Sequence, residues 1–129
     1  MLDERIYESY IGILKEEMVP AMGCTEPIAL AYGAARAREV LGKEPEHITA
    51  KCSGNIIKNV RCVIIPNSDG LTGIEAGVVL GAVAGNASLN MEVLSNVNEF
   101  ERKRCRELLD KKICNVELLD SPVVLHFII

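Results

Sequence analysis

The sequence predicts one α/β (α+β) domain over residues 1–129, in which several helices pack on a small mixed β-sheet. Two observations indicate this fold. Segments with apolar residues three and four positions apart alternate with short β-branched segments, and glycine, proline or asparagine separates them. The 129 residues are 49% hydrophobic and 25% charged, which favours a packed core and excludes a disordered chain.

Two helices are predicted in the first third of the chain. Residues 3–18 are amphipathic at helical spacing, and Asp3 is placed to cap their N-terminus. Residues 27–41 form the second helix, with Thr25 or Glu26 expected as its cap. The first half of this second helix is apolar nearly all round, so we expect it to be buried.

Four short segments are predicted to be strands, at residues 47–52, 60–65, 113–119 and 123–129. Between the first two, the run 56–65 fits either a helical turn followed by a strand or a strand throughout. The last segment, VVLHFII, is apolar at nearly every position, which is typical of a strand buried on both faces. We therefore expect this strand either to be central in the sheet or to belong to a longer protein.

Two more helices are predicted, at residues 72–86 and 97–112. In the first, glycines recur every four residues and share one face, which favours close approach to another backbone; they are Gly73, Gly77, Gly81 and Gly85. The second is amphipathic, and Asn96 or Asn98 is expected to cap it. Its expected inner face is Phe100, Cys105, Leu108 and Leu109.

Charge and composition exclude several classes of protein. The net charge is −4 and aromatic residues are only 4%, which argues against a nucleic-acid binder. No apolar run is long enough to span a membrane, and the first residues do not resemble an export signal. We therefore expect a cytoplasmic protein with reduced thiols. Four of its five cysteines are expected to fill the core: Cys52, Cys62, Cys105 and Cys114.

The segment MGCTEP places Cys24 just before the second predicted helix. The free N–H groups and dipole of a helix N-terminus favour a thiolate, which is the form needed in a nucleophile or a metal ligand. A buried cysteine in a helix-entry turn explains the same residues. A second segment, SGNIIKN, gathers hydroxyl, amide and ammonium groups that could bind a small carboxylate. An asparagine-rich turn with a solvated lysine explains it equally well.

The blocks MVPAMGCTEPIALAYGAARAREVLG and SGNIIKNV, followed by GIEAGVVLGAVAG and MEVL, resemble the N-terminal part of the L-cysteine desulfidase family. That family is related to the alpha chain of iron–sulfur L-serine dehydratase. The resemblance implies a lyase that gives pyruvate and ammonia by β-elimination from L-cysteine or L-serine. A [4Fe–4S] cluster with one open iron would act as the Lewis acid.

The resemblance also implies roles for individual residues. Cys24 corresponds to a cluster ligand and acts in catalysis through the cluster, and Glu26 is a second catalytic candidate. The substrate-binding candidates are Thr25, Ser53, Asn55, Lys58 and Asn59.

Family members are about three times longer, and their remaining cluster cysteines lie beyond residue 129. The chain is thus expected to be an N-terminal fragment that is inactive alone and holds no cluster. The implied partners are a small amino-acid substrate, a missing C-terminal segment or partner chain, and further copies of the chain in a homo-oligomer. Nucleic acids and membranes are not expected partners. Two other hypotheses remain: a non-catalytic small-molecule-binding module, and a structural module that docks through residues 123–129.

Overall fold

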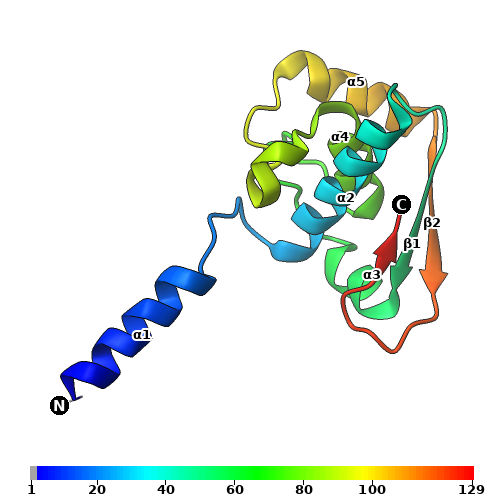
Figure 1. Ribbon diagram of the computed structural model, residues 1–129. Coiled ribbons are helices and arrows are strands. Elements are labelled where there is room, and N and C mark those ends of the chain that lie inside the picture. Colours follow the sequence, from blue (N-terminus) through cyan, green and yellow to red (C-terminus); the bar gives the residue numbers. More distant parts are fainter. Residues whose placement is uncertain (1–2) are drawn as a thin grey trace.

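The computed structural model describes residues 3–129, and its elements confirm the predicted α+β fold (Figure 1). Five α-helices, one 3-10 helix and three strands follow one another in this part of the chain. In order they are α1 (Glu4–Glu17), α2 (Thr25–Leu41), β1 (Ile48–Ser53), α3 (Gly54–Val60), α4 (Ile74–Ala84), η1 (Ala87–Glu92), α5 (Glu99–Asp110), β2 (Cys114–Leu119) and β3 (Phe127–Ile128).

The sheet has the strand order β2-β1-β3. Strands β1 and β2 are parallel, with Ile48 opposite Cys114, whereas β1 and β3 are antiparallel, with Cys52 opposite Phe127. Parallel strands need a long crossover, and α3, α4 and α5 supply it between β1 and β2. Because β1 is central, its inward side chains Ala50 and Cys52 are fully buried.

The core is built on the contact between α2 and α4. Apart from Glu75, helix α4 consists of apolar residues and glycine, and most of its residues are buried. A Cβ atom added at Gly81 would collide with the Ala31 carbonyl oxygen of α2. One added at Gly85 would lie only 2.8 Å from the Ala35 Cβ. These close contacts confirm the prediction that the glycine-bearing face meets another backbone.

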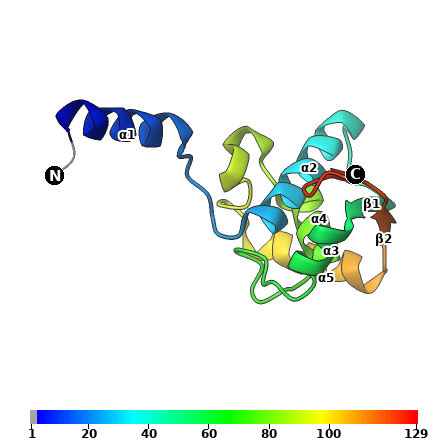
Figure 2. The ribbon, with the colours of Figure 1, turned by 90° about the horizontal axis from the view of Figure 1, so that it is seen from below.

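Helix α1 lies apart from the body of the molecule (Figures 1 and 2). Asp3 caps it as predicted, because its side chain accepts a hydrogen bond of 2.9 Å from the Arg5 backbone N–H. None of the residues of α1 is buried, and its apolar side chains Ile6, Tyr10 and Ile13 are exposed. The predicted helix is therefore present, but its apolar face has no partner among residues 3–129.

The predicted strand at residues 60–65 is wrong. Helix α3 ends at Val60, and only an isolated bridge between Ile64 and Thr72 forms in this region. The Val63 backbone N–H donates 3.1 Å back to the Val60 carbonyl, which turns the chain instead of extending it. Of the alternative with a helical turn followed by a strand, the helical part is present as the end of α3, but no strand forms between α3 and α4.

The predicted strand at residues 123–129 is also largely wrong, because only Phe127 and Ile128 are extended, and they form an edge strand. Side-chain hydrogen bonds hold the preceding residues in a turn. Ser121 Oγ accepts from the Val123 backbone N–H at 3.1 Å and lies 2.8 Å from His126 Nδ1. Such local side-chain contacts compete with strand pairing.

Three smaller predictions also need correction. The N-cap of α2 is Cys24 rather than Thr25 or Glu26, and its side chain makes no capping hydrogen bond. Phe100 is 78% exposed and does not belong to the inner face of α5, whereas the Asn98 cap is confirmed as part of a full capping box. Cys62 is exposed rather than a core residue. Among the described residues, no helix has the length and apolar character needed to cross a membrane.

Candidate functional site

The chain places a thiol, a carboxylate and an amide together at the start of α2. Cys24 Sγ lies 3.4 Å from Glu26 Oε2, and Asn59 Nδ2 donates to Glu26 Oε1 at 3.3 Å. Gly23 adopts a φ of +141°, a conformation that side-chain-bearing residues rarely adopt, and so allows the turn directly before Cys24. Two segments 33 residues apart are joined at Glu26, and we call Cys24, Glu26 and Asn59 the thiol cluster.

Hydrogen bonds lower the pKa of Glu26 below its usual value of 4.5. The largest contribution comes from its own backbone N–H, followed by the Cys24 thiol and the Asn59 amide. This carboxylate is therefore ionised at neutral pH. It acts as a fixed hydrogen-bond acceptor between the two segments, and its lowered pKa makes it a weak general base.

Helix α3 presents three of the predicted substrate-binding residues on one face. Asn55 and Asn59 are four positions apart and Lys58 is three positions from Asn55, so the three side chains are neighbours on the helix surface. Ile56 and Val60 are buried on the opposite face and fix the orientation of α3. Lys58 and Asn59 are exposed, and Asn55 is half-buried.

Of these three, only Asn59 belongs to the thiol cluster, and the other two predicted substrate-binding residues, Ser53 and Thr25, lie elsewhere. Ser53 is 2% exposed, and its hydroxyl donates to the Val124 carbonyl at 2.7 Å. The Ser53 side chain therefore holds the turn before β3, and its hydroxyl proton is used in that bond. Thr25 is exposed at the first position of α2, beside Cys24.

Three of the remaining four cysteines are less exposed than Cys24. Burial raises the pKa of Cys52 and of Cys105 to about 11 and that of Cys114 to about 12. These three thiols therefore stay protonated at neutral pH and are poor metal ligands. Cys62, like Cys24, is exposed. In residues 3–129, no three His, Cys, Asp or Glu side chains come together in a way that could hold a metal ion.

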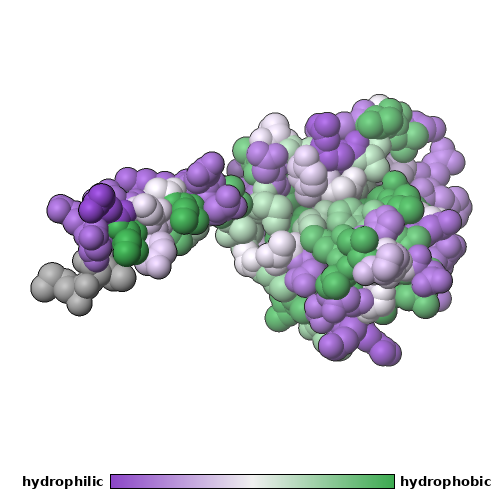
Figure 3. Space-filling model, turned by 60° about the horizontal axis from the view of Figure 1, so that its bottom comes forward, coloured by the Kyte–Doolittle hydropathy of each residue, from purple (hydrophilic) through white to green (hydrophobic). Residues whose placement is uncertain are grey.

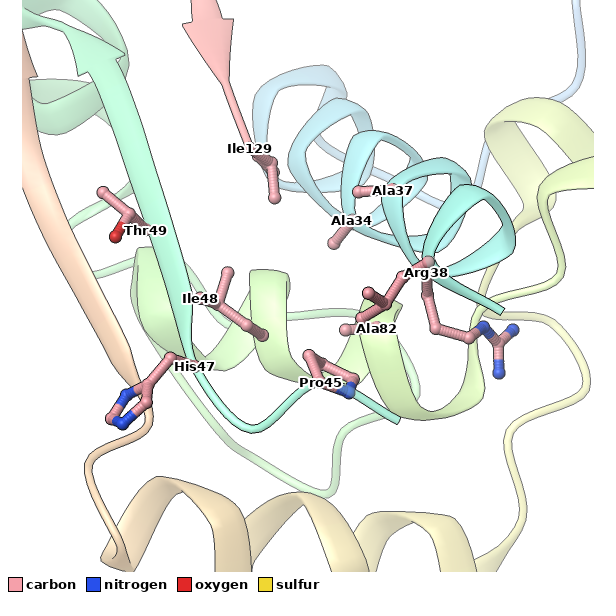
Figure 4. Close-up of a pocket in the computed structure, with 10 residues that line it drawn as sticks. Ala34, Ala37, Arg38, Pro45, His47, Ile48, Thr49, Ala82 and Ile129 are labelled. Carbon is pink, nitrogen blue, oxygen red and sulfur yellow. The ribbon is translucent and has the colours of Figure 1, made fainter. Parts of the chain in front are cut away.

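A separate apolar hollow of about 130 Å³ lies between α2, β1 and α4 (Figure 4). Ala34, Ile48, Ala82 and Ile129 surround it, while the polar end of His47 points away from it (Figure 4). It contains none of the residues that the sequence analysis selected. Its lining offers hydrophobic contact and little means of orienting a polar substrate.

The structure also shows a polar hollow that the sequence analysis missed. Arg102 donates to Asn67 Oδ1 at 3.1 Å, and Arg106 donates to Asp69 Oδ2 at 3.0 Å, so α5 is tied to the loop after Pro66. The available signal was the loop itself, PNSDG, together with two arginines one helical turn apart on the helix predicted at residues 97–112. Both guanidinium groups are already paired with the loop, so a structural role explains the two arginines without a ligand.

Comparison with known proteins finds relatives that are much longer than this chain. A UPF0597 protein of Desulfitobacterium hafniense is 48% identical over 126 residues, which are 98% of this chain and 29% of that protein. A UPF0597 protein of Treponema denticola is 47% identical over 125 residues, and one of Finegoldia magna is 50% identical over 114 residues. The chain spans less than a third of the length of these relatives.

These findings correct the resemblance proposed from the sequence. Proteins that match nearly the whole chain at 47–48% identity bear the name UPF0597, not that of L-cysteine desulfidase or L-serine dehydratase. No family model matches the chain. No solved structure matches it either. The chain is thus similar to UPF0597 proteins and matches part of the length of these longer proteins.

Proposed function

We propose that this chain is the part of a larger iron–sulfur amino-acid lyase that supplies one thiolate ligand, Cys24, and one wall of the substrate pocket. The observation that carries the proposal is the thiol cluster. Cys24 is exposed at the N-terminus of α2 and its thiol donates to Glu26, whereas Cys52 and Cys105 are buried and Cys114 is half-buried.

The residues present fit such a cluster in part. One exposed thiol at a helix N-terminus suits a single ligand, and a cluster with an open iron needs two more thiolates from outside residues 3–129. When bound, a cluster of this kind supplies a Lewis acid for the leaving hydroxyl or thiol group.

In this proposal, the residues of α3 bind and orient the amino-acid substrate. The Lys58 ammonium is exposed and can pair with the carboxylate of an amino acid, while the amides of Asn55 and Asn59 can accept from or donate to its polar groups. Because Glu26 is a weak base, we assign it the role of holding Cys24 and Asn59 rather than of removing the substrate proton. The proton acceptor is then supplied by the rest of the larger protein.

A non-catalytic module is the second candidate, and one observation favours it. The Ser53 hydroxyl is buried and engaged by Val124, so the polar groups of SGNIIKN do not all face one ligand. A binding or docking module needs Asn55, Lys58 and Asn59 but no thiolate.

Metal reconstitution separates the two candidates. This chain would replace the matching segment of the Desulfitobacterium hafniense relative, and the chimera would be treated anaerobically with iron and sulfide. Iron, labile sulfide and pyruvate formed from L-serine or L-cysteine would then be measured. We expect Cys24→Ala to lower bound iron and activity at least tenfold, whereas Cys62→Ala, which removes the other exposed thiol, leaves both unchanged.

Iron retained in full by the Cys24→Ala chimera would exclude Cys24 as a ligand. A chimera that binds no iron but binds an amino acid through Lys58 would establish the non-catalytic module. Pyruvate formation by the isolated 129-residue chain would refute the requirement for the rest of the larger protein.

A further inference from the structure

Four exposed apolar side chains belong to segments near the end of β1, since Leu118 is paired with Cys52 and the Val124 carbonyl accepts from Ser53. They are Leu118 of β2 and, in the turn before β3, Val123, Val124 and Leu125, with exposed fractions of 70%, 55%, 64% and 47%. We call these four residues the ridge. Seen from below, hydrophobic surface lies over this end of the body (Figure 3). Contiguous apolar patches of this kind mark interaction sites more often than isolated exposed side chains do.

The ridge is held in place by hydrogen bonds to the end of β1. Ser53 Oγ donates to the Val124 carbonyl at 2.7 Å, and the Ser53 backbone N–H donates to the His126 carbonyl at 2.9 Å. Ser121 and His126 close the same turn. The backbone of the turn is therefore already ordered before any partner binds, which lowers the entropic cost of docking there.

Helix α3 connects the ridge to the thiol cluster. At its first residue, a Cβ atom added to Gly54 would lie 3.9 Å from Leu118 Cδ1. Near its last residue, Asn59 donates to Glu26. The rise from Gly54 to Asn59 is about 8 Å at 1.5 Å per residue, so one covering polypeptide can contact both.

The relatives indicate what the occupant is. The Desulfitobacterium hafniense match includes 126 of the 129 residues, so the ridge region lies inside the matched part of a protein more than three times as long. We propose that the ridge is the docking surface for the polypeptide that makes up the remaining length of these relatives, and that this polypeptide also faces Cys24. Only the statement that this polypeptide also faces Cys24 rests on the proposed function.

Hydrogen exchange tests the docking surface in the full-length chimera described above, compared with the isolated chain. We expect the backbone N–H groups of residues 123–125 to exchange at least tenfold more slowly in the chimera. We also expect Leu125→Asp to lower the melting temperature of the chimera by several degrees and to leave that of the isolated chain nearly unchanged. The matched control is Val40→Asp, because Val40 is 91% exposed at the opposite end of α2 and should have no effect in either protein.

Equal exchange of residues 123–125 in both proteins would overturn the proposal, as would equal effects of Leu125→Asp and Val40→Asp on the chimera. Protection that appears in the isolated chain as its concentration rises would assign the ridge to a second copy instead. Repeating the exchange with Cys24→Ala separates this inference from the proposed function. Protection of the ridge that survives this substitution supports docking even if no iron is bound.

Discussion

Replacing Gly81 with alanine would place a methyl group where α4 touches α2. That methyl would collide with the carbonyl oxygen of Ala31, which is backbone within a buried helix and cannot move aside. We expect Gly81→Ala to lower the free energy of unfolding by about 3 kcal/mol, because the clash outweighs the gain in helix propensity of about 1 kcal/mol. Urea denaturation followed by circular dichroism measures the change.

Gly12 provides the matched control, since it is also inside a helix but has nothing within 4 Å of an added Cβ. Gly12→Ala should leave the unfolding transition of the body unchanged. Equal stability of Gly81→Ala and the original chain would mean that α2 and α4 can separate without cost, and the packing described above would be wrong.

At the scale of single residues, part of the candidate site could be predicted from the sequence. Cys24 and Glu26 share one motif, so their proximity follows from the start of a helix. Asn59 joins them through a contact between segments 33 residues apart, which no local pattern contains. The hydrogen bond of Ser53 was not predictable either, because its hydroxyl donates to a carbonyl 71 residues later in the chain.

At the scale of the element, we predict that the body of the molecule is stable without helix α1. None of its residues is buried, and an isolated helix of fewer than about 12–15 residues is marginal in water. Removing the residues before Val19 should therefore reduce the helical signal at low temperature but shift the melting temperature of the body by less than about 2 °C, since few contacts are lost.

A fall of more than 5–10 °C, on the order of a 1–2 kcal/mol loss, would show that α1 packs against the body in solution. The apolar face of α1 would then be buried by its own chain. Light scattering of the shortened chain checks the remaining possibility, because loss of a dimer on removal of α1 would assign that face to a second copy.

Among the elements, those with strong local signals were predicted well. Helices α1, α2, α4 and α5 have clear periodicity or end signals, and the Asn98 capping box is visible in the sequence. The strand expected at residues 123–129 is largely absent, because apolar residues do not by themselves fix strand pairing and only Phe127 and Ile128 pair with β1. A hydrogen bond donated by Ser53 and one accepted by Ser121 hold the turn in its conformation.

At the scale of the whole molecule, the order β2-β1-β3 was not predictable, because pairing between β1 and β2 depends on how three helices cross over the sheet.

The core of the folded molecule buries two thiol groups completely. Cys52 and Cys105 have no exposed surface, although they lie 53 residues apart and on different elements. Both thiols are therefore exposed to solvent only when the core opens.

This burial predicts a loss of stability at alkaline pH. Burial raises the pKa of Cys105 from 9.0 to about 11, so the native state holds this proton over a range in which the unfolded state has lost it. Ionisation then favours unfolding. The stability is fully present below pH 9.0 and falls as the pH rises toward about 11, by about 2 kcal/mol for this thiol.

Urea midpoints measured between pH 8 and pH 11 test this prediction. Cys105→Ala should flatten the alkaline decline in stability, whereas Val78→Ala, which opens a cavity in the same core without removing an ionisable group, should lower stability equally at every pH. Identical slopes for the two variants would mean that the Cys105 thiol does not titrate with unfolding.

Thiol labelling at neutral pH checks the burial of Cys105. The exposed Cys24 and Cys62 should react quickly. Cys105 should react only through unfolding, because its side chain is enclosed by the core.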